Sequence, residues 1–173
     1  MGVGILFAAR GVGTGIGPII ARSLFRDRAA WPAMIGWMVS LCGAGYVLVS
    51  LMEWDYWVVL VVIIAHAASG ANWVMSTVML QTLSEDSWRG RMFATDFLIM
   101  AGMNGLSTLV ASIWYDSGTV SLRQAILTLA ILQVIVGILW VVWISLRGRG
   151  IIAAVMAASE AESSDSSGLR SAA

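Results

Sequence analysis

Arg10 and His66 stand deep inside long apolar stretches of this sequence, where a charge is costly and needs a partner or a water-filled path. Arg10 comes twelve positions before Arg22, about 18 Å along a helix, which would place it near the middle of a membrane. Arg10 could bind an anionic substrate group or gate an ion pair; alternatively, it could lock helices together or extend outward to the interface. His66 is the only histidine and could exchange protons near neutral pH, or it could serve as a hydrogen-bonded packing residue.

A polar face surrounds His66 in the third apolar stretch. Helical spacing places a set of side chains on one side of that stretch: His66, Gly70, Trp73, Thr77 and Gln81. In the fourth stretch, Met103 and Ser107 share a face by the same rule. In a membrane bundle, such faces point toward neighbouring helices or toward an aqueous path.

These residues do not predict an enzyme. Ser107 and His66 loosely match the residue types of an intramembrane serine protease, but they lie at different predicted depths. The sequence has no paired acids and no metal-ligand cluster at a catalytic spacing. Cys42 is the single cysteine, so it cannot form an internal disulfide. We therefore expect no catalytic residue, no metal site, no cofactor and no nucleic-acid partner.

The elements that must position these side chains are five apolar stretches. They run over residues 2–24, 30–52, 56–83, 93–115 and 122–146. Each exceeds the roughly 20 residues that a helix needs to cross a bilayer, and backbone groups in lipid must be paired within a helix. Hydrophobic residues make up 59% of the chain and charged residues 12%. We expect an all-α, polytopic membrane helix bundle over residues 1–149, followed by a cytoplasmic, largely disordered tail over residues 150–173.

Loop charges predict the orientation of the bundle. Basic side chains gather in the first loop, the third loop and the start of the tail: Arg22, Arg26, Arg28, Arg89, Arg91, Arg147 and Arg149. The second loop carries Glu53 and Asp55 instead. Because Lys and Arg stay on the cytoplasmic side, we expect these basic segments and the C-terminus in the cytoplasm and Met1 outside. An outside N-terminus suggests that another helix once preceded Met1.

Alternating glycines mark the first apolar stretch. Gly11 and Gly15 form one small-xxx-small pair, and Gly13 and Gly17 form another. Such pairs let two helix backbones approach closely in lipid. We therefore expect a tight helix–helix contact here and not a nucleotide-binding loop, since no strand precedes the glycines.

Two segments carry a resemblance to a known family. Residues 4–28, GILFAARGVGTGIGPIIARSLFRDR, join a glycine-rich helix to a turn with Arg22, Asp27 and Arg28. Residues 69–95, SGANWVMSTVMLQTLSEDSWRGRMFAT, join a polar helix to an R-G-R loop. With the last two apolar stretches, they resemble the C-terminal portion, helices eight to twelve, of a major facilitator superfamily transporter of the bacterial drug-efflux-like branch. The family has a signature loop of the pattern G-x-L-a-D-R-x-G-R, which is echoed in its second half. The turn with Arg22, Asp27 and Arg28 matches this pattern only in part, because the glycine before the last arginine is missing.

The resemblance implies a partial half of a fold with two six-helix halves around a central cavity. It implies secondary active transport of small molecules in a bacterial inner membrane, as an efflux permease or antiporter that could be coupled to protons. The seventh helix and the N-terminal half would be absent from this chain and supplied as a partner. The resemblance assigns the cavity to Arg10, Thr14, His66, Gly70, Trp73, Thr77, Met103 and Ser107. It assigns cytoplasmic gating to Arg22, Asp27, Arg28, Arg89, Arg91 and Asp96.

Two other functions fit the same residues. The chain could be a non-transporting five-helix membrane protein that associates with a partner through its glycine face. It could also be one of two separate half-chains that assemble into a transporter. Five helices alone cannot supply both halves of an alternating-access cavity, so we expect no transport by the isolated chain.

Overall fold

The computed structural model describes residues 2–157 and residue 160. Within these residues the chain is all-α, with five long helices: α1 (Val3–Leu24), α2 (Trp31–Leu51), α3 (Trp57–Leu83), α4 (Asp86–Asp116) and α5 (Leu122–Arg147). A 3-10 helix, η1 (Arg28–Ala30), leads into α2. Each of the five is long and apolar enough to cross a membrane by length and composition. The all-α prediction is therefore confirmed, and the five predicted spans correspond to five long apolar helices that could cross a membrane.

The fourth span begins earlier than its apolar pattern predicts. Hydropathy predicts a start at residue 93, whereas α4 begins at Asp86. Arg89 and Arg91 therefore lie in the first turns of a helix and not in a loop. Hydropathy detects only the apolar part of a helix, and polar residues can continue it. An acid in the first turn suits the positive end of the helix dipole, and Asp86 also pairs with Arg89 at 2.6 Å.

The C-terminal region is helical at its start. Residues 149–157 form further helical turns after Gly148, and Val155 is buried there. The predicted tail over residues 150–173 thus begins with helix. Apart from residue 160, its remainder lies outside the described residues.

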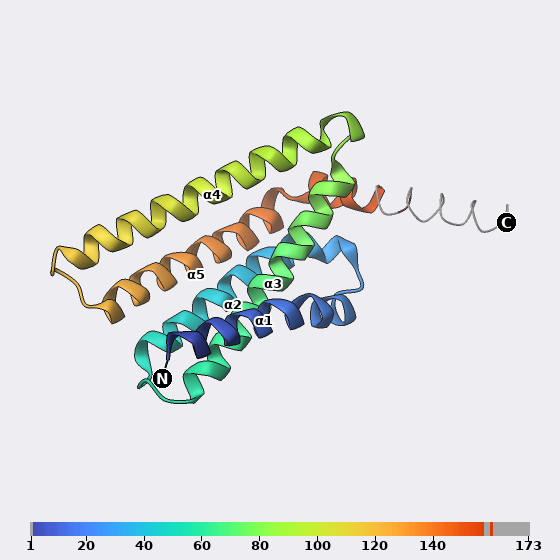
Figure 1. Cartoon of the computed structure of the whole chain (residues 1–173). Coiled ribbons are helices and arrows are strands. Elements are labelled where there is room, and N and C mark those ends of the chain that lie inside the picture. Colours follow the sequence, from blue (N-terminus) through green and yellow to red (C-terminus); the bar gives the residue numbers. More distant parts are fainter. Residues whose placement is uncertain (1, 158–159, 161–173) are drawn as a thin grey trace.

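Helix α2 lies at the centre of the bundle. It packs against α5 on one side and α3 on the other, and α1 packs along α3 (Figure 1). Helix α4 contacts α3 and α5 only sparsely and stands at the edge of the bundle (Figure 1). None of the residues of α4 is buried. The chain therefore forms a packed group of four helices with a fifth that lacks a close neighbour.

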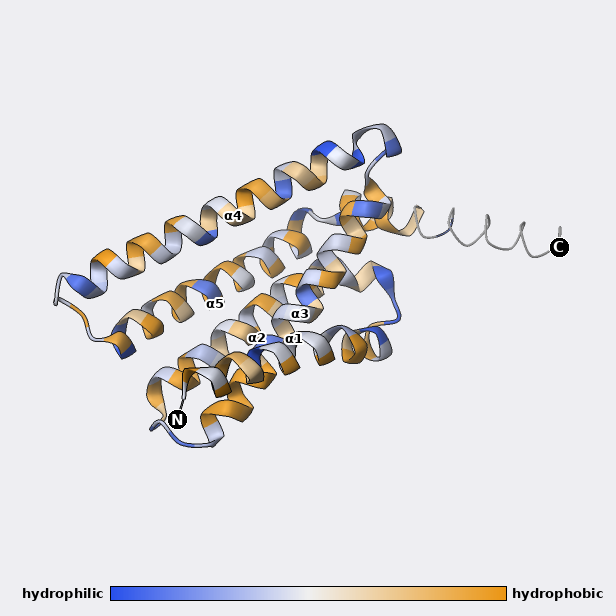
Figure 2. Cartoon of the chain, in the orientation of Figure 1, coloured by the Kyte–Doolittle hydropathy of each residue, from blue (hydrophilic) through white to orange (hydrophobic). Residues whose placement is uncertain are grey.

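Small residues face inward in this bundle and large apolar residues face outward. The buried residues of α1 recur every fourth position: Ala9, Gly13, Gly17 and Ala21. On the same helix the large Ile19 is 72% exposed. Figure 2 shows hydrophobic residues along most of each helix and hydrophilic ones in the connections and at scattered positions within the helices. This arrangement is typical of membrane helices, because lipid tails solvate large apolar side chains and helix contacts depend on small ones.

Close backbone contact explains the two tightest helix pairs. A Cβ added at Gly17 of α1 would overlap the backbone of Ala67 in α3. A Cβ added at Gly36 of α2 would lie 2.7 Å from the carbonyl oxygen of Gly137 in α5. Glycine is therefore required at both contacts at the observed helix separation. By contrast, Gly11 and Gly15 have open space beside them, so one of the two predicted small-residue pairs packs within the chain.

Polar side chains join α2 to α5 as well. The indole nitrogen of Trp140 donates to the carbonyl oxygen of Pro32 at 2.7 Å. The amide nitrogen of Gln133 donates to the carbonyl oxygen of Val39 at 3.3 Å. Hydrogen bonds between membrane helices each contribute modestly, about 0.6 kcal/mol on average. Together with Gly36 and Gly137, they make α2 and α5 a firm pair.

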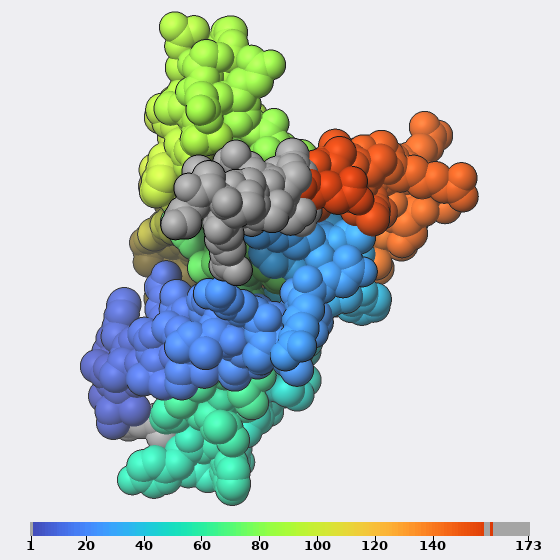
Figure 3. Space-filling view, turned by 90° about the vertical axis from the view of Figure 1, so that its right-hand side faces the viewer, coloured from blue at the N-terminus to red at the C-terminus, as the bar shows by residue number. Residues whose placement is uncertain are grey.

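One end of the bundle is splayed. Figure 3 shows the green segment between α3 and α4 and the orange-red end of α5 projecting in different directions. The blue segment that connects α1 to α2 also reaches the surface of this view. This is the end where the first-loop arginines and the residues at the start of α4 lie.

Candidate functional site

A cavity of about 260 Å³ opens between α1, α2 and α3, with Ile126 of α5 at its edge. Its polar lining consists of Arg10 from α1, Tyr46 from α2 and His66 from α3. Apolar side chains such as Phe7 cover the rest of the wall. All three helices are long and apolar enough to cross a membrane, so the cavity places a cation, a phenol and an imidazole among candidate membrane spans.

The phenol and the imidazole form a direct pair. The hydroxyl of Tyr46 lies 2.7 Å from Nε2 of His66, and the two rings meet edge to face with centroids 5.8 Å apart. His66 is 8% exposed. A buried hydroxyl and imidazole each need a hydrogen-bond partner, and each provides it for the other. The structure thus gives His66 a hydrogen-bonding partner inside the bundle, and both residues of the pair line the cavity.

Arg10 lines the cavity from α1. In the part of the chain that the structure describes, its guanidinium forms no ion pair and no hydrogen bond. The residue is exposed on α1. A guanidinium at a membrane depth requires an anion, carbonyl groups or water. Arg10 is therefore the group in this cavity that is ready to bind a negatively charged atom.

Thr14 and Gly70 lie next to this cavity but serve packing. The hydroxyl of Thr14 donates to the carbonyl oxygen of Arg10 at 2.9 Å, within its own helix. A Cβ at Gly70 would lie 2.9 Å from the Cα of Thr14. The two residues bring α1 and α3 together one turn away from Arg10 and His66, so they shape the cavity without lining it.

The other predicted cavity residues do not reach this site. Trp73 is exposed and packs its ring edge-on against Phe97 of α4, with centroids 6.1 Å apart. Thr77 is partly buried further along α3. On α4, Met103 is 59% exposed and Ser107 donates to the carbonyl oxygen of Asn104 at 2.9 Å. The structure thus brings Arg10 and His66 together, and it leaves Met103 and Ser107 on an open face.

The predicted gating residues divide between two local clusters. Asp27 accepts a hydrogen bond from the backbone of Ala29 at 2.9 Å and so caps η1. At the start of α4, the Arg91 guanidinium lies 5.0 Å from the centroid of the Trp88 ring.

The remaining gating residues follow the same division. Arg22 is exposed on the last turn of α1, and the Arg28 guanidinium lies 5.7 Å from the centroid of the Trp31 ring. Arg89 belongs with Arg91, and its only ion pair in the described residues is with Asp86. Asp96 is exposed on α4 and forms no ion pair among those residues.

Tyr46 is the site residue that sequence reasoning missed. It lies in the middle of an apolar stretch, and a hydroxyl in lipid needs a hydrogen-bond partner. The one histidine of the chain is an obvious partner, so this requirement could have singled out the pair. Trp54, from the segment between α2 and α3, also lines the cavity.

The arrangement supports binding and proton exchange. Arg10 supplies a fixed positive charge, and the Tyr46–His66 pair supplies a group that can gain or lose a proton. No set of three His, Cys, Asp or Glu side chains within the described residues could hold a metal ion. Comparisons of the chain with protein-family models, with curated proteins and with solved structures found no match.

Proposed function

We propose that this chain is a C-terminal portion of a secondary active transporter that exports small amphipathic molecules from a bacterial cell. The observation that carries the proposal is the shared cavity of Arg10, Tyr46 and His66 between helices long enough to span a membrane. Ionisable side chains at such a depth are costly and are kept where substrates or ions pass. The resemblance of residues 4–28 and 69–95 to the major facilitator superfamily supports the same function.

The roles follow from the chemistry of each group. Arg10 binds an anionic part of the substrate, and His66, held by Tyr46, carries the coupling proton. The clusters around Arg22, Asp27 and Arg28 and around Arg89, Arg91 and Asp96 act at the cytoplasmic gate. The cytoplasmic position of these two clusters follows from the rule that basic loops stay in the cytoplasm.

The lack of buried residues in α4 supports the presence of a partner that covers this helix. A long apolar helix with no buried residue gains little packing energy from its sparse contacts with α3 and α5. Its open face carries Met103 and Ser107, which the family resemblance assigns to the cavity. We therefore propose that helices from preceding sequence or from another polypeptide cover α4 and complete the cavity.

Photo-crosslinking in the native membrane tests the partner. A photoreactive residue at Met103 should crosslink to a polypeptide with membrane-spanning helices. The matched control is the same residue at Leu139, an exposed position on α5, and it should label lipid. Lipid adducts alone at both positions would contradict a partner on α4.

Transport by the purified assembly tests the activity. Vesicles that contain this chain together with the partner identified by crosslinking, without the crosslink itself, should move anionic amphipathic dyes when a pH gradient is applied. Arg10→Gln should abolish this movement, and Arg123→Gln, which removes the same charge at the exposed start of α5, should retain it. An assembly that moves no dye in any direction would favour the second candidate.

That second candidate is a non-transporting membrane protein that acts through helix–helix association. The bare face of α4 favours it, because this face fits any membrane helix partner. Under this function Arg10→Gln would leave the function of the complex unchanged, and the partner would form no second half of a cavity.

A further inference from the structure

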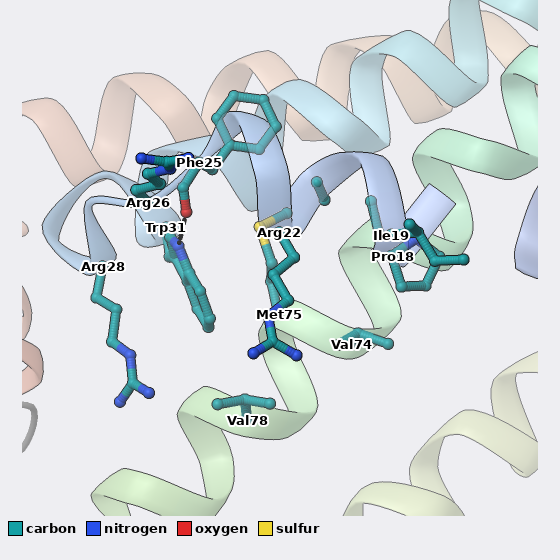
Figure 4. Close-up of a pocket in the computed structure, with 12 residues that line it drawn as sticks. Pro18, Ile19, Arg22, Phe25, Arg26, Arg28, Trp31, Val74, Met75 and Val78 are labelled. Carbon is teal, nitrogen blue, oxygen red and sulfur yellow. Dashed lines mark hydrogen bonds between the residues drawn. The ribbon is translucent and has the colours of Figure 1, made fainter. Parts of the chain in front are cut away.

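A second and larger cavity, of about 680 Å³, lies at the end of the bundle where α1 turns into α2 (Figure 4). Its walls come from the last turns of α1, from the segment between α1 and α2, and from α3. None of the residues assigned to the Arg10 cavity lines it. The two cavities are therefore separate sites on the same helix pair.

The lining of this cavity has two chemical parts. Arg22, Arg26 and Arg28 form a basic rim, and no acidic residue lines the cavity. The floor is apolar and comes largely from one face of α3: Ala71, Val74, Met75 and Val78. A ligand that fits both parts is an anion with an attached hydrocarbon chain.

The geometry of the rim fits a phosphate group. Figure 4 shows Arg22 and Arg28 extending to the same side, with the indole of Trp31 between them, while Arg26 lies toward Phe25. The Trp31 indole is held in place, since its nitrogen donates to the carbonyl oxygen of Phe25 at 3.1 Å. Guanidinium groups bind phosphate oxygens through paired hydrogen bonds, so the arginine side of the cavity has the chemistry that a phosphate group requires.

The depth of the cavity fits a lipid. Arg22 lies in the last turn of α1, and Trp and Arg at span ends sit at the headgroup level of a bilayer. Basic pockets between membrane helices on the cytoplasmic side bind anionic headgroups. A free phosphate ion would make no use of the apolar floor, whereas an acyl chain would cover Val74 and Val78.

We propose that this cavity binds an anionic phospholipid, with its phosphate at Arg22 and Arg28 and one acyl chain along α3. The site does not depend on the transport function proposed above. It would fasten the α1–α2 connection to the membrane leaflet on that side of the bundle.

Native mass spectrometry of the detergent-solubilised chain tests the site. Phosphatidylglycerol should remain bound and phosphatidylcholine should not. The double variant R22Q/R28Q should weaken the affinity for phosphatidylglycerol about thirtyfold, because each basic residue near a headgroup contributes about 1 kcal/mol to binding. The matched control R147Q/R149Q removes the same charge outside the cavity and should leave binding unchanged. Equal losses in both double variants, or no loss in R22Q/R28Q, would overturn the proposal.

A further variant separates a lipid from a free anion. Val78→Trp fills the apolar floor and keeps every arginine, so it should also lose phosphatidylglycerol. Millimolar inorganic phosphate should fail to displace the lipid from the wild-type chain. Retained binding in Val78→Trp, or displacement by phosphate, would show a simple anion site instead. Slow maleimide labelling of the buried Cys42 shows that each variant is folded.

Discussion

The hydroxyl of Tyr46 and Nε2 of His66 lie 2.7 Å apart, and this hydrogen bond joins α2 to α3 beside the cavity that contains Arg10. Tyr46→Phe removes the hydroxyl and leaves the buried imidazole without its partner. We expect a loss of about 0.6 to 1.7 kcal/mol in the free energy of unfolding, which spans the average and the largest values found for hydrogen bonds between membrane helices.

Cys42 offers a direct measurement of this loss. It is the only cysteine and is 7% exposed, so a maleimide reacts with it mainly when the bundle opens. Labelling of Tyr46→Phe should accelerate about three- to twentyfold. Tyr56→Phe is the control, because Tyr56 is 80% exposed, and its labelling rate should match that of the wild type. A wild-type rate in Tyr46→Phe would mean that the bond contributes nothing to stability.

Neighbouring glycines of α1 should respond in opposite directions to the same substitution. Ala at Gly15 meets open space and should stabilise the helix by up to about 1 kcal/mol through its better helix propensity. Ala at Gly17 would overlap the Ala67 backbone and should push α1 away from α3, which lowers the melting temperature.

Thermal unfolding in detergent checks this pair of variants. Gly17→Ala should melt below the wild type, and Gly15→Ala at or above it. Because both variants add one methyl group to the same helix, the comparison cancels the effect of propensity. Equal melting temperatures would show that α1 does not approach α3 as closely as the structure indicates.

The sequence could predict the spans but not all of their contacts. Length and hydropathy were sufficient for the five helices, because lipid demands paired backbone groups whatever the tertiary structure is. The start of α4 at Asp86 was hidden, since hydropathy cannot follow a helix into its polar turns. Which glycine pair packs against another helix, Gly11 with Gly15 or Gly13 with Gly17, depends on the rotation of α1 about its axis. That rotation is set by the partner helix α3, and no local pattern reports it.

The same reason explains the partial prediction of the site. Arg10 and His66 were found because each is an ionisable side chain in an apolar stretch, which is a local property. Their meeting in one cavity depends on the packing of α1 against α3. Met103 and Ser107 share a face of α4 as predicted, but that face stays away from the cavity in the described chain. Helical spacing in a sequence shows which residues share a face, but it does not show which helix packs against that face.

The orientation of the chain is open to a labelling test. In a Cys42→Ala background, Ser23→Cys places a thiol beside the arginines of the α1–α2 connection, and Glu53→Cys places one at the opposite end of α2. Because basic loops stay in the cytoplasm, a membrane-impermeant maleimide should label Glu53→Cys in intact cells. It should label Ser23→Cys only after lysis. The reverse pattern would invert the proposed topology.

Hydrogen exchange should set α4 apart from the other helices. Because α4 has no buried residue while α2 and α3 have many, opening of α4 costs less free energy, and local stability follows packing. In detergent micelles, amides of residues 98–112 should therefore exchange faster than those of residues 60–74, although both segments are apolar and helical. Addition of the partner captured through Met103 should slow exchange in α4 and leave α3 unchanged. Equal protection of α3 and α4 in the isolated chain would mean that α4 already has a close neighbour.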